Sequence, residues 1–468
     1  MTRTAVINVV GLSESLLGDD TPKLRAFRER GALTRIEPAF PAVTCTAQSN
    51  YLTGRAPAEH GIVGNGWYHR ELAEVQFWKQ SNHLVAGKKL WQTLREADPG
   101  FTCAKLFWWF NMYSGADWSI TPRPLYPADG RKLFDIYAWP YSIRDEIKRE
   151  LGEFPFPGFW GPAAGVDSRR FSADAVSRWI AESAKWIERK FTPTLNLVYL
   201  PHLDYNLQRF GPNHSVIASD LRRIDAIVGD LLTFFAQQSV QVVLLSEYGM
   251  SAVDTPVHLN RLFREHGWLT VKEELGCELL DAGASRVFAV ADHQVAHVYV
   301  KDPVLEPAVR SLLERQPGIA EVWAATEKKA HALDHPRAGD LIAVARDRAW
   351  FTYYYWLDDR RAPDFARTVD IHRKPGYDPV ELFLDPKLPR VKARIAWRLL
   401  QKKLGFRMLM DVIPLDASLV KGSHGNRPAN PAEWPLLISS RPDLLPRSVI
   451  HSTDVFAVLH NHVTGSRQ

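Results

Sequence analysis

Short apolar segments alternate with amphipathic segments along most of this chain, and that alternation limits the folds open to it. Apolar runs of four to eight residues are typical of buried strands, whereas apolar residues recurring every three or four positions indicate helices. Parallel strands need a long crossover between them, usually a helix, so the alternation predicts a largely parallel sheet with helices on both faces. The predicted strands are 5–10, 101–108, 194–200, 240–246, 286–291 and 297–300, and the predicted helices are 21–31, 172–190 and 216–238.

Two segments interrupt this pattern. Residues of approximately 122–171 are rich in proline, glycine and aromatic side chains, and those of approximately 330–420 include an aromatic cluster, a proline-rich loop and a basic stretch. We therefore expect one three-layer α/β/α domain over residues 1–468, with both segments as insertions that cap the active site. The basic stretch "RVKARIAWRLLQKKLGFR" (390–407) predicts a helix. It could contact a membrane surface or a partner, and a solvated charged face is the interpretation that we favour.

Charge, cysteine content and hydropathy exclude several classes of protein. The 58 basic and 53 acidic side chains leave a net charge of +5, which is too small to indicate nucleic-acid binding but mildly favours an anionic substrate. Cys45, Cys103 and Cys277 lie too far apart for a zinc motif or a disulfide framework. The N-terminal residues lack signal-peptide features, and no apolar run approaches the roughly 18 residues of a membrane span. We expect a cytoplasmic protein with no membrane span and no stable nucleic-acid complex; the oligomeric state stays open.

Polar side chains gather just after the predicted strands, where ligands of an open α/β sheet bind. Thr44, in "FPAVTCTAQSNYLTG", begins a predicted helix; taken alone it is an ordinary helix cap, and as a nucleophile it would need activation. Asp204 could likewise be only a helix cap, and a lone histidine is more often structural than a ligand. The order and spacing of the whole set nevertheless indicate a site. Its other members are His202, Gln208, Glu247, Tyr248, Asp292, His293, His297, Asp370, His372, Lys374, Asp378 and His424.

The ordered set resembles the alkaline phosphatase superfamily, and within it the nucleotide pyrophosphatase/phosphodiesterase-like branch. The resemblance runs from "AVINVVGL" through "PAVTCTAQSNYLTGRAPAEHGIVGN", "LDYNLQRFGP" and "LSEYGM" to "GSHG", so it spans most of the chain. It implies an alkaline phosphatase-like fold, a nucleophile at Thr44 on a helix N-terminus, and a role for Asn65 in holding the transferred phosphoryl group. It also implies metal ligands at Asp204, Glu247 and His424.

Four positions depart from the metal-ligand pattern of that family. Val10 stands where the family has its first aspartate, and Gln208 stands where the family's Asp-x-x-x-His motif ends in histidine. Glu247 and Tyr248 stand where the family has an Asp-His pair. Each of the two metal sites that the resemblance implies therefore loses part of its ligand set.

A threonine hydroxyl is a weak nucleophile at neutral pH and needs a base, a metal or a lowered pKa. The segment "DIHRKPGYDP" concentrates metal-capable and basic side chains in a loop with no other evident role. We expect Asp370 and His372 to complete a rearranged metal site, with Lys374 near the substrate phosphate. Mixed oxygen and nitrogen ligands favour Zn²⁺, with Mn²⁺ and Fe²⁺ as alternatives, and we expect one or two ions.

These features together predict a metal-dependent hydrolase of phosphodiester or pyrophosphate bonds. Thr44 attacks phosphorus, water resolves the covalent intermediate, and metal ions with Asn65 stabilise the charge on the phosphoryl oxygens. The expected partner is a small phosphorylated substrate, with nucleotides among the candidates. A sulfatase is disfavoured, because "CTAQ" after Thr44 does not match the Cys/Ser-x-Pro-x-Arg context of those enzymes. The competing hypothesis, motivated by the ligand substitutions, is a catalytically weak or inactive member that binds a phosphorylated metabolite or a partner.

Overall fold

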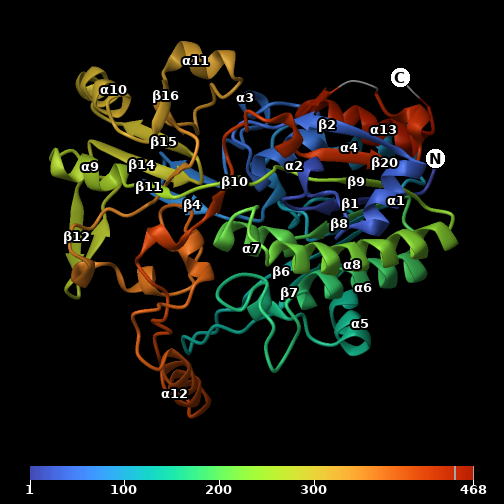
Figure 1. Cartoon of the computed structure of the whole chain (residues 1–468), viewed down its shortest axis with the longest axis horizontal. Helices are drawn as coiled ribbons and strands as arrows, with labels where there is room; N and C mark the ends of the chain where they lie inside the picture. Colours follow the sequence, from blue (N-terminus) through green and yellow to red (C-terminus); the bar gives the residue numbers. More distant parts are fainter. Residues whose placement is uncertain (447–448, 467–468) are drawn as a thin grey trace.

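A nine-stranded sheet forms the centre of the larger lobe in this computed structural model, which describes residues 1–446 and 449–466 (Figure 1). The strand order is β21-β2-β20-β9-β1-β8-β5-β6-β7. Neighbours from β9 to β6 run parallel, whereas β20 and β7 pair antiparallel with the strands inside them. The strands are β1 (Thr4–Val9), β2 (Ala32–Glu37), β5 (Cys103–Leu106), β6 (Trp118–Pro122), β7 (Ile136–Trp139), β8 (Leu195–Leu200), β9 (Gln241–Leu245), β20 (Leu436–Ser439) and β21 (Ile450–His451).

The three central strands follow directly from the sequence pattern. β1 and β8 are buried along their whole length, as parallel strands covered on both faces must be. In their register Val6 lies beside Leu197 on one side and beside Val243 of β9 on the other. The predicted strands at 5–10, 194–200 and 240–246 are confirmed to within one residue at each end.

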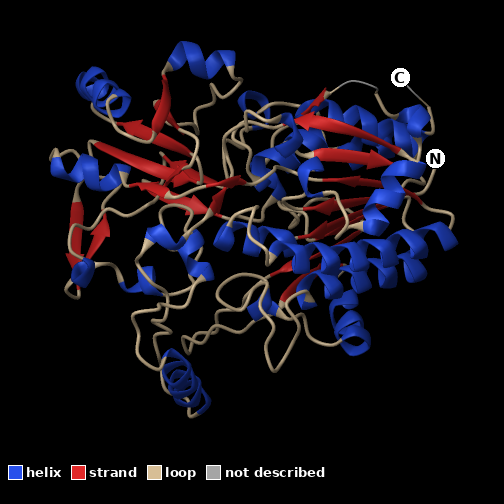
Figure 2. Ribbon diagram, in the orientation of Figure 1, coloured by secondary structure: helices blue, strands red, loops and turns tan. Residues whose placement is uncertain are grey.

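Helices cover both faces of this sheet and give the predicted three layers (Figure 2). On one face α6 packs against α8, and α8 packs against α1; on the other face α13 packs against α2 and α4. The three-layer α/β/α prediction with a largely parallel sheet is thereby confirmed. These helices are α1 (Pro22–Arg30), α2 (Thr44–Thr53), α4 (Leu90–Ala97), α5 (Ser142–Leu151), α6 (Ala175–Phe191), α7 (His202–Phe210), α8 (Ile217–Gln237) and α13 (Val455–Thr464).

A second lobe has its own core around a four-stranded antiparallel sheet in the order β14-β15-β17-β16. Its strands are β14 (Val287–Asp292), β15 (Val295–Val300), β16 (Ile319–Trp323) and β17 (Leu341–Ala345). The strands expected at 286–291 and 297–300 therefore belong to a separate sheet. The physical reason is their connection: only two residues separate β14 from β15, which permits an antiparallel hairpin but not a parallel crossover.

This lobe is larger than the expected insertion at 330–420. Its core draws on Tyr68, Phe77 and residues from about 253 to 420, so that segment forms only its second half. The segment 122–171 contributes β7 and α5, which extend the edge of the main sheet, although its Trp160 packs against Tyr377 beside the site. The remaining elements are α3 (Pro57–His60), β3 (Gly66–His69), β4 (Glu74–Phe77), β10 (Ser251–Ala252), β11 (Thr255–Val257), α9 (Leu259–Glu265), β12 (Val271–Glu274), β13 (Cys277–Leu280), α10 (Glu306–Glu314), α11 (Ala325–Ala330), β18 (Ala349–Phe351), α12 (Val391–Lys403) and β19 (Gly422–Ser423). Within the described ranges, none of the helices has the length and apolarity needed to cross a membrane.

Candidate active site

The carboxyl ends of the central strands carry the predicted site. Thr44 is the first residue of α2, and its side chain is buried. Asp204 lies in the first turn of α7, just after β8, and Gln208 follows one turn later on the same helix. Glu247 and Tyr248 come directly after β9. The parallel arrangement of β8, β1 and β9 thus brings residues about forty to two hundred positions apart to one edge of the sheet.

A chain of hydrogen bonds runs from Thr44 into this cluster. The Thr44 hydroxyl lies 3.5 Å from the Tyr248 hydroxyl, which donates to Oδ1 of Asp204 at 3.2 Å. The second carboxylate oxygen, Oδ2, accepts from Nε2 of Gln208 at 2.7 Å. Oε1 of Gln208 in turn accepts from the Tyr377 hydroxyl at 2.9 Å. Both oxygens of Asp204 are therefore occupied by protein donors.

Stacked rings close this chain into a circuit. The Tyr248 ring lies 3.5 Å from the His424 ring, with only 7° between their planes. His424 lies 3.6 Å from His293, which lies 3.7 Å from the ring of Tyr377. Nδ1 of His424 also lies 2.7 Å from the carbonyl oxygen of Ala42, just before α2. We call the six residues Tyr248, Asp204, Gln208, Tyr377, His293 and His424 the closed circuit.

The carboxyl group of Glu247 faces Thr44 from the other side. Its Oε1 accepts hydrogen bonds from the side-chain amides of Asn8 and Gln48. Burial raises the pKa of Glu247 to about 8, and hydrogen bonds from Gln48, Asn8 and Thr44 act against that rise. Among the described residues, no side chain or backbone group makes a hydrogen bond to Oε2, which is buried. Glu247 is thus a carboxyl group beside the Thr44 hydroxyl with one oxygen open.

Asn65 ties the start of α2 to the second lobe. Its Oδ1 accepts from the backbone N–H of Cys45 at 3.1 Å, and its Nδ2 donates to Oδ1 of Asp292 at 3.0 Å. Its own backbone N–H donates to Oδ2 of Asp292 at 2.7 Å. The side-chain amide has a second proton that this network does not use, so Asn65 can still donate to an anion held at the α2 N-terminus.

Burial disfavours the charged form of every ionisable side chain in this site. It raises the pKa of Asp204 to about 6 and that of Asp292 to about 7. It lowers the pKa of His424 to about 3, and that of His293 falls well below its usual value, again through burial. At neutral pH both histidines are therefore uncharged, and the carboxyl groups lie near their titration points.

The segment expected to complete the site is used elsewhere. Nζ of Lys374 is buried and pairs with Oδ2 of Asp378 at 2.7 Å and with Oε1 of Glu381 at 2.8 Å. It is not available as a free cation for substrate phosphate, so that expectation is corrected. Nδ1 of His372 lies 3.2 Å from the carbonyl oxygen of Phe77, and the backbone N–H of Asp370 donates to Glu381. The reason is the burial of Glu381 and Asp378, which draws Lys374 away from the Thr44 cluster.

Sequence reasoning missed three residues of the site. Asn8 is a polar residue inside the otherwise apolar strand β1, and that break in the pattern is a signal that could have found it. Gln48 lies one helical turn after Thr44, where a helix places neighbouring side chains on one face. Tyr377 carries no such signal, because its contact with Gln208 joins residues 169 positions apart.

The resemblance implies a pair of divalent metal ions, and the residues present do not fit it. Val10 is apolar, Gln208 directs an amide N–H at Asp204, and Tyr248 brings a neutral phenol in place of an imidazole. A protonated amide nitrogen cannot ligate a metal, and both oxygens of Asp204 already accept hydrogen bonds. Over residues 1–446 and 449–466, no group of three or more His, Cys, Asp or Glu side chains could hold a metal ion. Asp370 and His372 therefore do not complete a metal site with Asp204, Glu247 or His424.

Metal removal should consequently leave the folded protein unchanged. We expect dialysis against a chelator, or addition of Zn²⁺ or Mn²⁺, to shift Tm by less than about 1 °C. A resident ion present at about a thousand times its dissociation constant would contribute about 4 kcal/mol to stability. Differential scanning calorimetry with elemental analysis of the same sample makes the comparison. A stoichiometric ion whose removal lowers Tm by several degrees would contradict our interpretation.

Comparison with known proteins identifies the family to which this chain belongs. The sequence model of the type I phosphodiesterase / nucleotide pyrophosphatase family matches residues 4–378, which is most of the chain. An uncharacterized pyrophosphatase/phosphodiesterase of Schizosaccharomyces pombe is 23% identical over 248 residues. That match covers 52% of this chain and 42% of the yeast protein, so the chain spans less than half of that relative's length.

Solved structures share the fold over nearly the whole chain. Phosphonoacetate hydrolase from Sinorhizobium meliloti, in complex with phosphonoformate, is 16% identical with a TM-score of 0.62, covering 99% of this chain and 95% of the other. An inactive threonine-to-alanine variant of murine ectonucleotide pyrophosphatase/phosphodiesterase 5, in complex with AMP, is 14% identical with a TM-score of 0.58, covering 100% and 96%. Since the family match covers well over half of its length, this chain belongs to the type I phosphodiesterase / nucleotide pyrophosphatase family.

Proposed function

We propose that this protein hydrolyses a phosphodiester or pyrophosphate bond, with Thr44 as nucleophile and Glu247 as its general base. The observation that carries the proposal is the position of Thr44, which begins α2 with its hydroxyl 3.5 Å from the hydroxyl of Tyr248, the residue next to Glu247; the Thr44 hydroxyl acts on the pKa of the Glu247 carboxyl group, whose Oε2 has no partner among the described residues. A helix N-terminus stabilises negative charge, so it favours both an anionic phosphoryl group and a developing alkoxide. A carboxylate within hydrogen-bond reach of a hydroxyl is the arrangement that general-base catalysis needs.

The proposed chemical step uses side chains and backbone groups of this chain, the substrate and one water molecule. The Thr44 oxygen forms a bond to phosphorus, its proton passes to a carboxylate oxygen of Glu247, and the bond from phosphorus to the leaving oxygen breaks. The second proton of Asn65 Nδ2 and the backbone N–H groups at the start of α2 bind the phosphoryl oxygens. Glu247 then gives that proton to the leaving oxygen. In the second step water attacks phosphorus, the bond from phosphorus to the Thr44 oxygen breaks, and one proton of the water passes through Glu247 to that oxygen, which restores the threonine. Because the residues do not fit the metal pair of the resemblance, no step in this proposal uses Zn²⁺, Mn²⁺ or Fe²⁺.

The substrate class that we propose is a small phosphorylated molecule, with nucleotides included. It is supported by the family and by two structural relatives, one bound to AMP and the other to phosphonoformate.

The Cys45, Cys103 and Cys277 thiols are all free, which agrees with the reducing, cytoplasmic setting expected from the sequence.

Substitution of Glu247 tests the base. We expect wild-type hydrolysis of bis-p-nitrophenyl phosphate to rise with pH through about 8, because the deprotonated carboxylate is the active form. Glu247→Gln should lower kcat by about 10²-fold and flatten that profile, since an amide takes up no proton. The matched control is Glu188→Gln, a change at a buried carboxylate that pairs with Arg3 away from the site, and it should keep the profile. A Glu247→Gln enzyme with wild-type kcat and pH dependence would rule out this base.

A second candidate function is binding of a phosphorylated ligand with little turnover. The closed circuit favours it, because the positions of lost metal ligands are filled by mutual hydrogen bonds and stacking, and because Thr44 is only 3% exposed. The same assay distinguishes the two functions when it is run with bis-p-nitrophenyl phosphate and p-nitrophenyl phosphate, with and without Zn²⁺ and Mn²⁺. Saturable AMP binding by calorimetry without turnover under any condition would support the binding protein.

A further inference from the structure

Helix α12 presents its apolar side outward. Trp397, Leu400 and Leu404 are 58%, 44% and 64% exposed and recur at helical spacing along one stripe. The opposite, half-buried side carries Arg394 and Arg398, which both bind the carboxylate of Asp411. Val391 and Ile395 on that inner side pack against the core of the second lobe, so the helix already has apolar contacts with the fold. The outward stripe takes no part in those contacts and therefore needs an explanation outside the fold.

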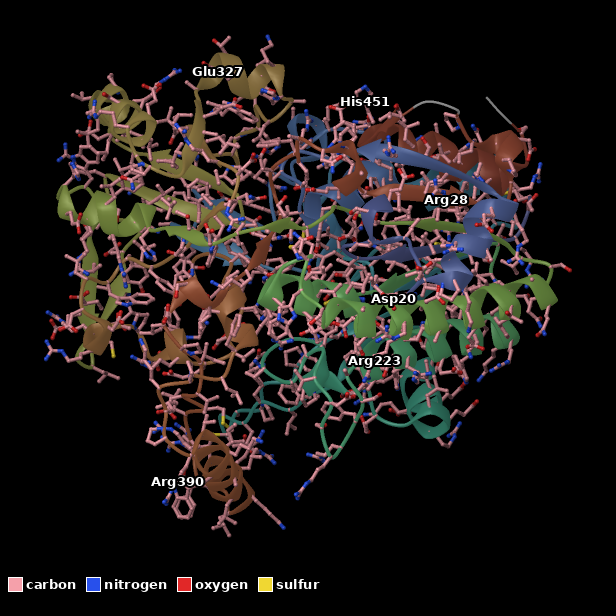
Figure 3. The ribbon with its side chains drawn as sticks, in the orientation of Figure 1. Asp20, Arg28, Arg223, Glu327, Arg390 and His451 are labelled. Carbon is pink, nitrogen blue, oxygen red and sulfur yellow. The ribbon has the colours of Figure 1, made fainter. Side chains whose placement is uncertain are left out.

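The same segment is strongly cationic. Residues 386–410 contain eight basic side chains and no Asp or Glu. Asp385 and Asp411 adjoin this segment; Asp385 pairs with Arg367, and Asp411 is bound by the two arginines on the inner side. Helix α12 projects from the bottom of the molecule, and Figure 3 shows Arg390 there, away from both lobes. The basic residues are Lys387, Arg390, Lys392, Arg394, Arg398, Lys402, Lys403 and Arg407.

A second segment, distant in sequence, extends the same surface. Nζ of Lys402 donates to the carbonyl oxygen of Lys132 at 3.4 Å and lies 5.8 Å from the centre of the Phe134 ring. In Figure 1 the loop leading to β7 reaches toward α12 at the bottom of the molecule. Ten of the 21 large apolar side chains exposed in the described chain lie on these two segments, which the contacts of Lys402 join. We call this patch the cationic tip: Leu125, Tyr126, Leu133, Phe134, Trp397, Leu399, Leu400, Leu404, Phe406 and Leu409, with the basic residues of 386–410 around them.

We propose that the cationic tip binds the surface of an anionic lipid bilayer. Apolar and aromatic side chains on a helix rich in Lys and Arg are the composition that inserts at the boundary between headgroups and acyl chains. Trp and Tyr prefer that boundary, where one part of the ring is apolar and its polar atom stays hydrated. Basic side chains beside them are attracted to the negative surface potential of anionic lipids.

Charge and shape favour the bilayer over a protein partner. A second copy of this chain would bring a like-charged tip, and that repulsion opposes self-association through this surface. The tip is a projecting helix and loop, whereas protein partners that bind an amphipathic helix usually enclose its apolar face in a groove. A bilayer surface accommodates such a projection because its headgroups rearrange around it.

Vesicle flotation with the full chain tests this proposal. We expect the protein to float with vesicles of phosphatidylcholine containing about 30% phosphatidylserine, and not with pure phosphatidylcholine. Raising the salt concentration should release it, because screening weakens the attraction of exposed charges. Trp397→Ser/Leu400→Ser and, separately, Lys402→Glu/Lys403→Glu should each lower partitioning by at least about tenfold.

Matched variants remove the same kinds of side chain elsewhere. Leu275→Ser/Val304→Ser removes two exposed apolar residues from the second lobe, and Lys272→Glu/Lys329→Glu reverses two exposed charges there. Both should float like the wild type, and circular dichroism should show all four variants folded. Equal partitioning by tip and control variants, or no flotation with anionic vesicles, would overturn the proposal. Two other results would also overturn the proposal. One is concentration-dependent dimerisation that Trp397→Ser/Leu400→Ser abolishes. The other is binding of polyglutamate, without binding to vesicles, that the same variant abolishes.

Discussion

Thr44→Ala is expected to abolish hydrolysis, lowering kcat by about 10⁴-fold or more. Loss of the nucleophile in an enzyme that forms a covalent intermediate has effects of this order or larger, because the remaining groups have nothing to activate. The variant keeps its backbone at the start of α2, where Thr44 makes no side-chain cap, so the helix itself should be unaffected. Initial rates on bis-p-nitrophenyl phosphate at pH 8 measure the loss.

Two further variants separate chemistry from folding. Thr44→Ser keeps a hydroxyl group beside Glu247 and should retain measurable turnover. Thr46→Ala removes a buried hydroxyl from the same helix that donates only to the carbonyl oxygen of Ile62, so it should reduce stability but not the chemical step. Intact mass after rapid acid quench should show a phosphorylated adduct in the wild type and none in Thr44→Ala. Turnover that survives Thr44→Ala would exclude Thr44 as the nucleophile.

Lys374→Met should destabilise the protein by about 3–5 kcal/mol at pH 7. Removing one partner of a buried ion pair leaves uncompensated charge, which costs several times more than an exposed pair is worth. Here two buried carboxylates, Asp378 and Glu381, would lose their common cation. Burial acts to lower the pKa of Lys374, but those two carboxylates outweigh it and leave the pKa raised. The lysine is therefore fully charged at pH 7, and urea denaturation there measures the whole loss.

The loss of stability in Lys374→Met should depend on pH, and its direction of change tests the charge explanation. Burial raises the pKa of Glu381 and Lys374 acts to lower it, so without Lys374 the pKa of Glu381 in the folded state should lie still further above its unfolded value. The folded state then binds more protons, so the stability of the variant rises as the pH falls and the deficit narrows toward pH 5. Adding Glu381→Gln to Lys374→Met should recover part of the loss, whereas the exposed Lys392→Met should change stability by less than about 0.5 kcal/mol. A deficit that does not depend on pH would show that lost packing, and not charge, explains the effect.

Runs of apolar residues in the sequence were enough to predict the central strands of the main sheet. The strands β1, β8 and β9 are mostly apolar, so their burial could be predicted from the sequence. The second lobe escaped prediction because β14 and β15 have the same apolar composition as the central strands. Which sheet a buried strand joins depends on its connections, and the two-residue turn at His293–Gln294 makes this pair a hairpin.

The candidate site was likewise predicted in part from the sequence, and the rest depended on contacts between distant residues. The order of the motifs brought Thr44, Asn65, Asp204, Glu247 and His424 into one hypothesis, and the structure does bring them to one region. The same reasoning placed Lys374 at substrate, because a basic residue in a loop has no visible partner until the chain is folded. Its actual partner Glu381 is seven positions away and buried, so the ion pair forms within the second lobe.

The sequence by itself determined the layered α/β fold, the start of α2 at Thr44 and the substitutions that remove metal ligands. These are properties of single residues and short patterns, which are fully present in the unfolded chain. Only the tertiary structure decided what replaced the ligands: Gln208 and Tyr248 hold Asp204, and Tyr377 closes the circuit. It also decided that the apolar side of α12 faces outward. The physical reason is that directional contacts between distant residues exist only when packing brings their elements together.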